Sequence, residues 1–312
     1  MSTPESLKRK KVLILGASGF LGKSLVKALV EKDVEIRTYD RGASLDQFEN
    51  ANIASFKGDF VEGSHLDEAL ADTDVVYHLI STTIPGTSNL DLSADISSNL
   101  QASIRLLEKI KTHNIKKLIF ISSGGAVYGN PLSLPVAETH PLYPISSYGI
   151  VKTTIEQYIY MFSKLYGLES TVLRLSNPYG PNQFKIGLQG FISTCFKKII
   201  NDEVLEIWGN GSVIRDYIYI NDAIDAMLKA LEDTGTNTYN IGSGVGHSLQ
   251  EVINIISKII GKKANVTYLP KRTVDVDKIY LDISKAKPGL NWTPKYSLEE
   301  GCKHYWTMSN TK

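Results

Sequence analysis

A tyrosine and a lysine four residues apart are the side chains in this sequence best suited to chemistry. Tyr148-Gly149-Ile150-Val151-Lys152 places the phenol and the ammonium on one helix face. An isolated phenol, with a pKa of about 10, is a poor base at neutral pH. A neighbouring ammonium favours the phenolate and lowers that pKa, so the pair predicts proton transfer. The alternative is an accidental pair on a helix flank, because this spacing is common.

A glycine-rich loop upstream of the pair favours proton transfer over accidental pairing. The loop Gly16–Gly22 (GASGFLG) lies between an apolar strand, Lys11–Leu15, and a helix with apolar residues at helical spacing, Phe20–Glu31. Glycines permit a tight turn and a close approach to a pyrophosphate, and a helix N-terminus donates N–H groups to it. The loop therefore predicts a dinucleotide site, with a glycine turn that binds nothing as the alternative.

An acidic residue at the end of the next strand indicates which dinucleotide binds. The strand Val34–Tyr39 is followed by Asp40, 18 residues after Gly22. A carboxylate at this place accepts hydrogen bonds from an adenosine ribose and repels a 2′-phosphate, which favours NAD. Arg41 is the residue type that accommodates such a phosphate, so NADP stays open.

Strands that alternate with helices must position these residues. The further elements expected in the first half are strands at Ile53–Lys57, Asp74–Leu79, Lys117–Ser122 and Ser170–Leu175, and helices at Asp91–His113 and Ser146–Tyr166. Such alternation predicts βαβ crossovers, and near-continuous apolar strands predict a sheet covered on both faces. We therefore expect an α/β fold, a Rossmann-like doubly wound parallel sheet that binds ligands beyond the carboxyl ends of its strands.

The pattern changes after Asn177–Pro181, where loops lengthen and strands become short. The elements expected there are strands at Leu205–Trp208, Val266–Leu269 and Lys278–Leu281, and helices at Gly190–Ile200, Asp222–Glu232, Leu249–Ile260 and Leu298–Trp306. We expect residues 1–180 to form the dinucleotide-binding domain. Residues 181–312 are expected to form mainly a smaller α/β substrate-binding lobe, with some segments returning to the sheet.

Composition excludes several classes of protein. The 312 residues are 42% hydrophobic and 21% charged, with a formal net charge of +1, which argues against a nucleic-acid partner. Cys195 and Cys302 are far apart, which fits a reduced cytoplasmic protein without a disulfide framework or a metal site. The apolar runs are too short for a signal segment or a membrane span, so no membrane partner is expected.

The sequence resembles the extended short-chain dehydrogenase/reductase family, in its nucleotide-sugar epimerase/dehydratase branch, from about Lys11 to Trp306. Besides the loop and the tyrosine–lysine pair, the matching segments are Gly58-Asp59, His78–Ser81, Ser122–Gly129, Arg174–Pro181, Gly209–Gly211, Arg215–Tyr219 and Asn291–Pro294. The resemblance implies NAD as the cofactor and a UDP- or dTDP-linked hexose as the substrate, in a UDP-glucose 4-epimerase-like enzyme of polysaccharide biosynthesis. It also implies a homodimer, for which Asp91–His113 and Ser146–Tyr166 are candidate helices.

The resemblance also assigns roles to individual residues. The cofactor-binding residues that it implies are Gly16, Ser18, Gly19, Phe20, Leu21, Gly22, Asp40, Arg41, Asp59, Phe60, Leu79, Ser81, Asn99, Ser122, Tyr148 and Lys152. The substrate-binding residues that it implies are Gly124, Tyr148, Asn177, Gln189, Ile207, Arg215, Arg272, Asp275 and Ile279. Tyr148, Lys152 and Ser123 are the implied catalytic residues. For Arg215 and Arg272 the alternative is an ordinary ion pair.

The residues before Tyr128 narrow the reaction. Family 4,6-dehydratases carry an Asp-Glu pair where this chain has Gly125 and Ala126, which cannot move protons. Hydride transfer at C4 of the sugar remains, either in a 4-epimerase that reduces its own 4-keto sugar or in an NAD(P)H-dependent 4-ketoreductase of a 4-keto-6-deoxy nucleotide sugar. A remote alternative is a non-catalytic regulator that senses NAD, although such proteins typically lack the tyrosine or the lysine.

Two positions bear on the choice between these reactions and on the sugar. Epimerases of the family usually carry Ser or Thr four residues before Tyr128, where this chain has Gly124, and Ser122 or Ser123 is the candidate replacement. The missing hydroxyl favours the ketoreductase, whereas Asp40 and the nucleotide-binding motifs favour the epimerase. Ile279, three residues before Asp282, is expected beside the C2 substituent, where it leaves room for an N-acetyl group.

Overall fold

A seven-stranded sheet is the centre of the fold. The computed structural model describes residues 9–42, 53–181, 183, 190–271 and 276–310. The sheet strands, from one edge to the other, are β10 (Thr236–Ile241), β6 (Glu169–Leu175), β5 (Lys117–Ser123), β4 (Val75–His78), β1 (Lys10–Leu15), β2 (Val34–Asp40) and β3 (Ile53–Lys57). Every neighbouring pair is parallel. The predicted Rossmann-like doubly wound parallel sheet is confirmed.

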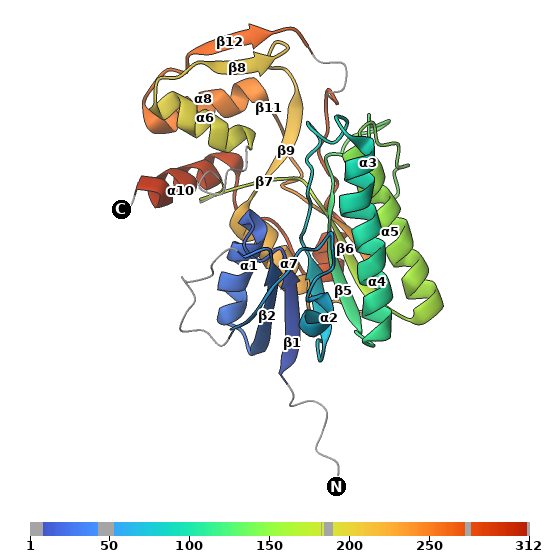
Figure 1. Cartoon of the computed structure of the whole chain (residues 1–312). Coiled ribbons are helices and arrows are strands. Elements are labelled where there is room, and N and C mark those ends of the chain that lie inside the picture. The colour runs from blue at the N-terminus through green and yellow to red at the C-terminus, as the bar shows by residue number, and fades with distance from the viewer. Residues whose placement is uncertain (1–8, 43–52, 182, 184–189, 272–275, 311–312) are drawn as a thin grey trace.

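The side chains of β1 show how both faces of the sheet are buried. Val12 and Ile14 point to one apolar core, and Leu13 and Leu15 to the other, because successive side chains of a strand alternate. The first core is covered by α1 (Phe20–Val30) and α7 (Ile220–Ala230). The second is covered by α2 (Leu66–Leu70), α4 (Ala102–Thr112) and α5 (Ser147–Tyr166). Figure 1 shows the sheet between these layers.

A smaller lobe lies above the carboxyl ends of the sheet strands (Figure 1). Its strands are β7 (Asn177–Tyr179), β9 (Ile214–Tyr219) and β11 (Gly246–Ser248) in one sheet and β8 (Leu205–Trp208) and β12 (Val266–Leu269) in another. Its helices are α6 (Phe191–Ile200), α8 (Leu249–Ile260) and α10 (Leu298–Asn310). The chain is not divided simply at residue 180, because β10 pairs with β6 in the large sheet and α9 (Ala286–Leu290) packs near β10.

Two predicted elements differ in the structure. The expected strand Lys278–Leu281 is only a pair of isolated bridges, in which Lys278 pairs with Ile214 and Leu281 with Val136. The expected helix Asp91–His113 is continuous but changes character, because α3 (Leu92–Asp95) leads into a π-helical turn, η3 (Ile96–Gln101), before α4. Such turns are rare and frequently occur at functional sites.

A buried ion pair fixes α5 to the sheet. Arg174 Nη2 on β6 lies 2.6 Å from Glu156 Oε2 on α5, and both side chains are buried. Glu156 also accepts a hydrogen bond from Ser122 of β5, and Arg174 donates to the Tyr128 hydroxyl at 3.0 Å. Tyr128 in turn donates to Asn240 of β10 at 2.6 Å. One network therefore joins α5 to three neighbouring strands.

The described residues contain neither a membrane-spanning helix nor a cluster of metal-binding side chains. No helix in that part of the chain is both long enough and apolar enough to cross a bilayer. In the same residues, no three His, Cys, Asp or Glu side chains are grouped so that they could hold a metal ion.

One buried histidine makes the stability of the fold depend on pH. His78 at the end of β4 lies between the rings of Phe60 and Phe120, at centroid distances of 5.1 and 5.3 Å, and its Nε2 is 2.9 Å from Ser103 Oγ. Burial, reinforced by the charge of Lys152, lowers the pKa of His78 to about 3. The folded protein therefore keeps this ring neutral, whereas the unfolded chain takes up a proton below its ordinary pKa of 6.5.

We expect the free energy of unfolding to depend less on pH in the acid range for His78→Leu than for the wild type. Between pH 6.5 and 3, the unfolded state binds one more proton than the folded state, so unfolding free energy falls as pH falls, by about 1.4 kcal/mol per pH unit from this group. Denaturant unfolding across this range measures the slope. His65→Asn, at an exposed histidine, is the control. Equal slopes in wild type and His78→Leu would contradict the assignment.

Candidate active site

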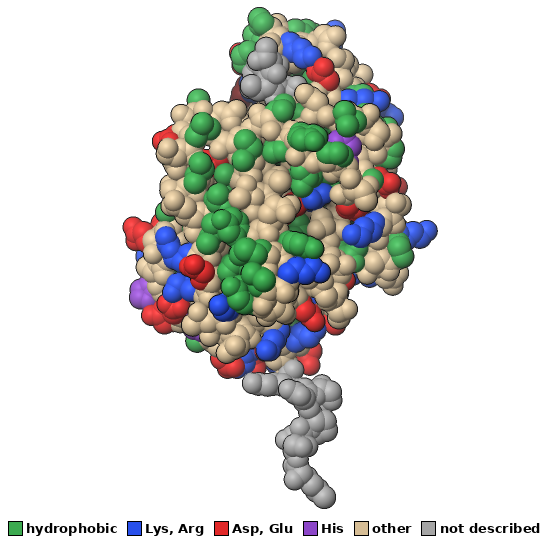
Figure 2. Space-filling view, turned by 90° about the vertical axis from the view of Figure 1, so that its right-hand side faces the viewer, with side chains coloured by type: hydrophobic (Ala, Val, Ile, Leu, Met, Phe, Trp, Pro, Cys, Tyr) green, Lys and Arg blue, Asp and Glu red, His purple; other side chains and the backbone are tan. Residues whose placement is uncertain are grey.

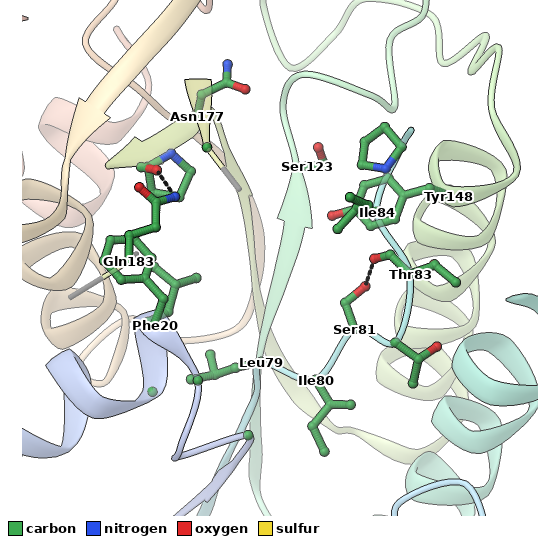
Figure 3. Close-up of a pocket in the computed structure, with 18 of the residues that line it drawn as sticks. Phe20, Leu79, Ile80, Ser81, Thr83, Ile84, Ser123, Tyr148, Asn177 and Gln183 are labelled. Atoms are coloured by element: carbon green, nitrogen blue, oxygen red, sulfur yellow. Dashed lines mark hydrogen bonds between the residues drawn. The ribbon is translucent and has the colours of Figure 1, made fainter. Parts of the chain in front are cut away.

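A cavity of about 800 Å³ opens over the carboxyl ends of β1, β2, β4 and β5, where they face the smaller lobe. Its walls come from both parts of the chain. Figure 3 shows Phe20, Leu79 and Ile80 at its base, Ser123 and Tyr148 on one side and Asn177 and Gln183 opposite them. A cavity at this edge of a parallel sheet is where ligands of doubly wound folds bind.

The glycine loop brings backbone to the cavity wall at close range. Gly16 has a φ of +90°, which residues other than glycine rarely adopt. Its N–H donates to Tyr39 O at 3.0 Å. At Gly22 an added Cβ would lie 2.1 Å from Gly16 O, so a larger residue would push α1 away from β1. Phe20, Leu21 and Gly22 in the first turn of α1 line the cavity. This arrangement suits a pyrophosphate.

Two carboxylates stand on the same wall. The Ser18 N–H donates to Asp40 Oδ2 at 2.6 Å, which fixes the carboxylate at the end of β2 beside the loop. Asp59 Oδ1 accepts from Val61 N at 2.7 Å. Among the described residues, no hydrogen bond is made to Asp40 Oδ1 or Asp59 Oδ2, so both oxygens can accept hydrogen bonds from ribose or adenine. The remaining cavity-lining residues among the expected cofactor contacts are Gly16, Ser18, Gly19, Arg41, Phe60, Leu79 and Ser81.

Tyr148 and Ser123 face each other across the end of β5 (Figure 3). Both line the cavity, and the Ser123 hydroxyl is close enough to the phenol to lower its pKa. Lys152 lies one turn further along α5, where it is buried. Its ammonium donates to Ile121 O at 2.9 Å and is 5.8 Å from the centre of the Tyr148 ring. The i, i+4 spacing thus places the ammonium below the phenol and outside the cavity wall.

The pKa values of this pair differ from the sequence expectation. Burial raises the pKa of Tyr148 to about 12, with a smaller contribution from Asp95, and only the hydrogen bond with Ser123 opposes it. Burial also lowers the pKa of Lys152 to about 8, while Glu156 and Asp95 raise it. Loss of water at the buried phenol thus outweighs the lowering of the tyrosine pKa that the neighbouring ammonium was expected to give.

The structure also explains Gly124. This residue does not line the cavity, and a Cβ there would lie 2.6 Å from Leu281 Cδ1 and 3.0 Å from Arg174 O. Close packing therefore requires glycine at position 124, which lies outside the lining of the cavity. Ser123, one residue earlier, presents the hydroxyl instead, and Ser122 points away to Glu156. Ser122 does not line the cavity, and the cofactor contact expected for it stays a prediction.

On the opposite wall, three of the residues expected at the substrate line the cavity: Asn177, Ile207 and Arg215. Asn177 Nδ2 donates to Asp216 O at 2.7 Å, which orients the amide. Ile279 does not line the cavity, because it is 2% exposed in an apolar cluster with Tyr128 and Leu281. The gating role expected for it stays a prediction. Gln189, Arg272 and Asp275 lie outside the described residues.

Other wall residues were missed by the sequence reasoning. They include Thr82, Thr83, Ile84, Pro85, Ser176, Gln183 and Trp208. The first four follow the strand end His78–Ser81, so their place after β4 was the available signal. Asn99 was expected at the cofactor, but its amide lies behind this loop: Nδ2 donates to Thr82 Oγ1 at 2.7 Å and to Asp95 Oδ1 at 2.8 Å.

Comparisons with known proteins agree with this geometry. The model of the NAD dependent epimerase/dehydratase family matches residues 12–242. The chain is 35% identical to a putative UDP-glucose 4-epimerase of Methanocaldococcus jannaschii, covering 96% of this chain and 99% of that protein. It is 33% identical to a dTDP-4-dehydro-6-deoxyglucose reductase of Escherichia coli, with coverages of 93% and 96%.

A solved structure is similar throughout. The crystal structure of UDP-glucose 4-epimerase from Thermotoga maritima with UDP-glucose has a TM-score of 0.89 and 33% identity, covering 95% of this chain and 97% of that one. The family model and these full-length similarities coincide with a glycine loop and a tyrosine–lysine pair that meet at one cavity. The chain therefore belongs to the NAD-dependent epimerase/dehydratase family.

Proposed function

We propose that the protein is an NAD-dependent nucleotide-sugar 4-epimerase that acts on a UDP-hexose. The observation that carries the proposal is the meeting of Tyr148 and Ser123 in one cavity, between a dinucleotide-type glycine loop and a wall with Arg215. The similarity to UDP-glucose 4-epimerases over nearly the full chain supports the same reaction. Activated hexoses of this kind supply polysaccharide biosynthesis, which is the role we propose.

The residues at the glycine loop fit NAD. Gly16 and Gly22 permit the close approach that a pyrophosphate needs, and the first turn of α1 directs its N–H groups toward it. Asp40 is fixed by the Ser18 N–H and presents a negative charge where NADP would carry its 2′-phosphate, so NAD is favoured although Arg41 is adjacent. When bound, NAD accepts a hydride from C4 of the sugar and returns it.

The protein side of the reaction is proton transfer in a fixed geometry. Tyr148 takes the proton of the 4-hydroxyl and later returns it, and Ser123 holds the phenol and the sugar oxygen by hydrogen bonds. Lys152 lies below the ring, and its charge together with that of a bound nicotinamide would favour the phenolate that accepts this proton. Arg215 is a fixed guanidinium suited to the substrate pyrophosphate. The keto sugar then turns between the two hydride transfers while its nucleotide stays held.

A 4-ketoreductase is the second candidate, and one observation favours it. The chain is 33% identical to a dTDP-4-dehydro-6-deoxyglucose reductase over 300 residues. A reductase needs the same tyrosine, lysine and serine but carries out one hydride transfer and exchanges its cofactor.

We expect the purified protein to interconvert UDP-glucose and UDP-galactose, or their N-acetyl forms, without added reductant. Tyr148→Phe removes the proton carrier and should lower kcat at least about a hundredfold. Product analysis by NMR and measurement of the released nucleotide give the readout. Tyr143→Phe, at an exposed tyrosine, is the control. Consumption of NAD(P)H with a 4-keto-6-deoxy nucleotide sugar, and no interconversion, would replace the epimerase by the reductase.

A second prediction separates Ser123 from Gly124. Ser123→Ala should lower kcat about a hundredfold, because one hydroxyl donor at the reacting oxygen is lost. Gly124→Ser should not restore the activity of Ser123→Ala, and should destabilise the fold by about 1–3 kcal/mol through its contact with Leu281.

Gly125→Ser is the matched control for the second prediction, since a Cβ at Gly125 meets no atom within 4 Å. Thermal unfolding and steady-state rates are measured for the wild type and the four variants. Recovery of activity in the Ser123→Ala/Gly124→Ser double variant would show that position 124 faces the sugar after all.

We also propose that two copies of the chain pair through α3, η3 and α5. Exposed apolar side chains follow one another on this face: Leu92, Ile96, Ile150, Met161 and Leu165 are 37–64% exposed. Figure 2 shows hydrophobic side chains gathered on the side of the molecule that carries these helices. A contiguous apolar face on a water-exposed helix pair is a typical contact between identical subunits.

The two buried free thiols, Cys195 and Cys302, support a cytoplasmic location.

Charged residues on this apolar face should separate the subunits. We expect Met161→Glu/Leu165→Glu to sediment as a monomer at concentrations where the wild type sediments as a dimer, because burying two carboxylates is costly. Val245→Glu, at an equally exposed apolar residue of the smaller lobe, is the control and should leave the sedimentation unchanged. An unaltered dimer in the double variant would place the interface elsewhere.

A further inference from the structure

Asp95 is a fully buried carboxylate to which the proposed reaction assigns no role. It is 0% exposed and ends α3. Its Oδ1 accepts from Thr83 Oγ1 at 2.6 Å and from Asn99 Nδ2 at 2.8 Å, and its Oδ2 accepts from Ser147 Oγ at 2.6 Å. All three donors are neutral. A buried carboxylate is costly unless its hydrogen bonds are well formed, so its three bonds join their partners tightly.

The partners of Asp95 belong to the two sides of the catalytic centre. Thr83 lies in the cavity-lining loop Ser81–Pro85, and Ser147 is the residue before Tyr148 at the start of α5. In Figure 3, Thr83 and Ile84 lie beside the Tyr148 ring. One carboxylate therefore bridges the loop and the helix end that carries the phenol.

The π-helical turn adds a second bridge from the same place. Asn99 in η3 is 7% exposed, and its Oδ1 accepts from Thr82 N at 2.9 Å while its Nδ2 donates to Thr82 Oγ1 at 2.7 Å. The loop is tied to α5 once more beyond this point, since Tyr148 N donates to Ser88 Oγ at 3.1 Å. We call Asp95, Asn99, Thr83 and Ser147 the polar clamp.

We propose that Asp95 is a positioning residue, which through the polar clamp holds the loop Ser81–Pro85 at a fixed place relative to Tyr148 so that C4 of the sugar meets the phenol. The proposal rests on the proposed function, because it assigns the loop to the sugar. Displacement of the loop by about 1 Å can lower the rate up to about a hundredfold. The rate therefore depends on how firmly the polar clamp holds the loop.

Asp95 also acts on the charge of the catalytic pair. Its negative charge raises the pKa of Tyr148 and of Lys152. The other groups that face this pair are Glu156, which also raises the pKa of Lys152, and His78, on which Lys152 acts from β4. Removing the negative charge at Asp95 therefore favours loss of a proton from both Tyr148 and Lys152.

Two variants separate the bonds of Asp95 from its charge. Thr83→Val keeps the shape and the charge but breaks one bond of the clamp, so kcat should fall about tenfold with little change in KM, since Arg215 still holds the nucleotide. Thr83→Ser keeps the hydroxyl and should retain most of the activity. Asp95→Asn removes the charge, so both limbs of the kcat pH profile should move to lower pH, whereas Thr83→Val should leave the profile in place.

The control is Ser97→Ala, an exposed residue of η3 whose hydroxyl bonds only to Ala94 O among the described residues. It should match wild type in rate and pH profile. Wild-type kcat in Thr83→Val, together with an unmoved profile in Asp95→Asn, would overturn the proposal.

Amide hydrogen exchange distinguishes failure of the clamp from failure of the proposed function. In the free protein, the peptide that covers residues 79–90 should exchange faster in Asp95→Ala and Thr83→Val than in wild type and Ser97→Ala. If wild type acts on no nucleotide sugar but this difference is found, the clamp stands and the assigned reaction is wrong. Equal exchange rates in all four proteins would contradict the proposed role of the polar clamp, whichever reaction the enzyme catalyses.

Discussion

The arrangement of the active site depends on the buried ion pair between Arg174 and Glu156. It is the one full charge pair that joins α5 to the centre of the large sheet among the described residues, and both side chains are almost entirely buried. Removing one partner of such a pair costs about 3–5 kcal/mol, because the other charge is left buried without compensation. Since Tyr148 and Lys152 lie on the same helix as Glu156, this pair sets where the phenol stands over the end of β5.

Tyr148 is consequently held from two directions. Glu156 anchors α5 to β6 two turns below the phenol, and the polar clamp anchors its first residue, Ser147, to the loop after β4. The cavity lies between them. The glycine loop lines one side of this cavity and Arg215 lines the other. Ligands bound on these two sides would therefore meet a Tyr148 side chain that is already fixed in place. Such preorganisation is the usual source of rate enhancement at proton-transfer sites.

The sequence predicted what local patterns determine. Apolar strands such as Lys11–Leu15 and the turn chemistry of Gly16–Gly22 depend on neighbours along the chain, and the doubly wound sheet followed from them. β10 was missed because Thr236–Ile241 is polar at its start and pairs with a strand more than sixty residues earlier. The role of Asp95 was not predictable, because its burial is created by a loop and by α5, which are distant in sequence or lie on other elements. The packing role of Gly124 was not predictable either, because it depends on Leu281, which is far away in the sequence.

The place of β10 in the large sheet has a consequence for synthesis of the chain. β6 ends at Leu175, but the strand that covers its free edge begins at Thr236. At roughly 5–20 residues per second, this edge stays unpaired for several seconds while residues 176–235 are translated. An uncovered strand edge can pair with other chains, so early docking of β10 shortens the period in which the nascent protein is open to such pairing.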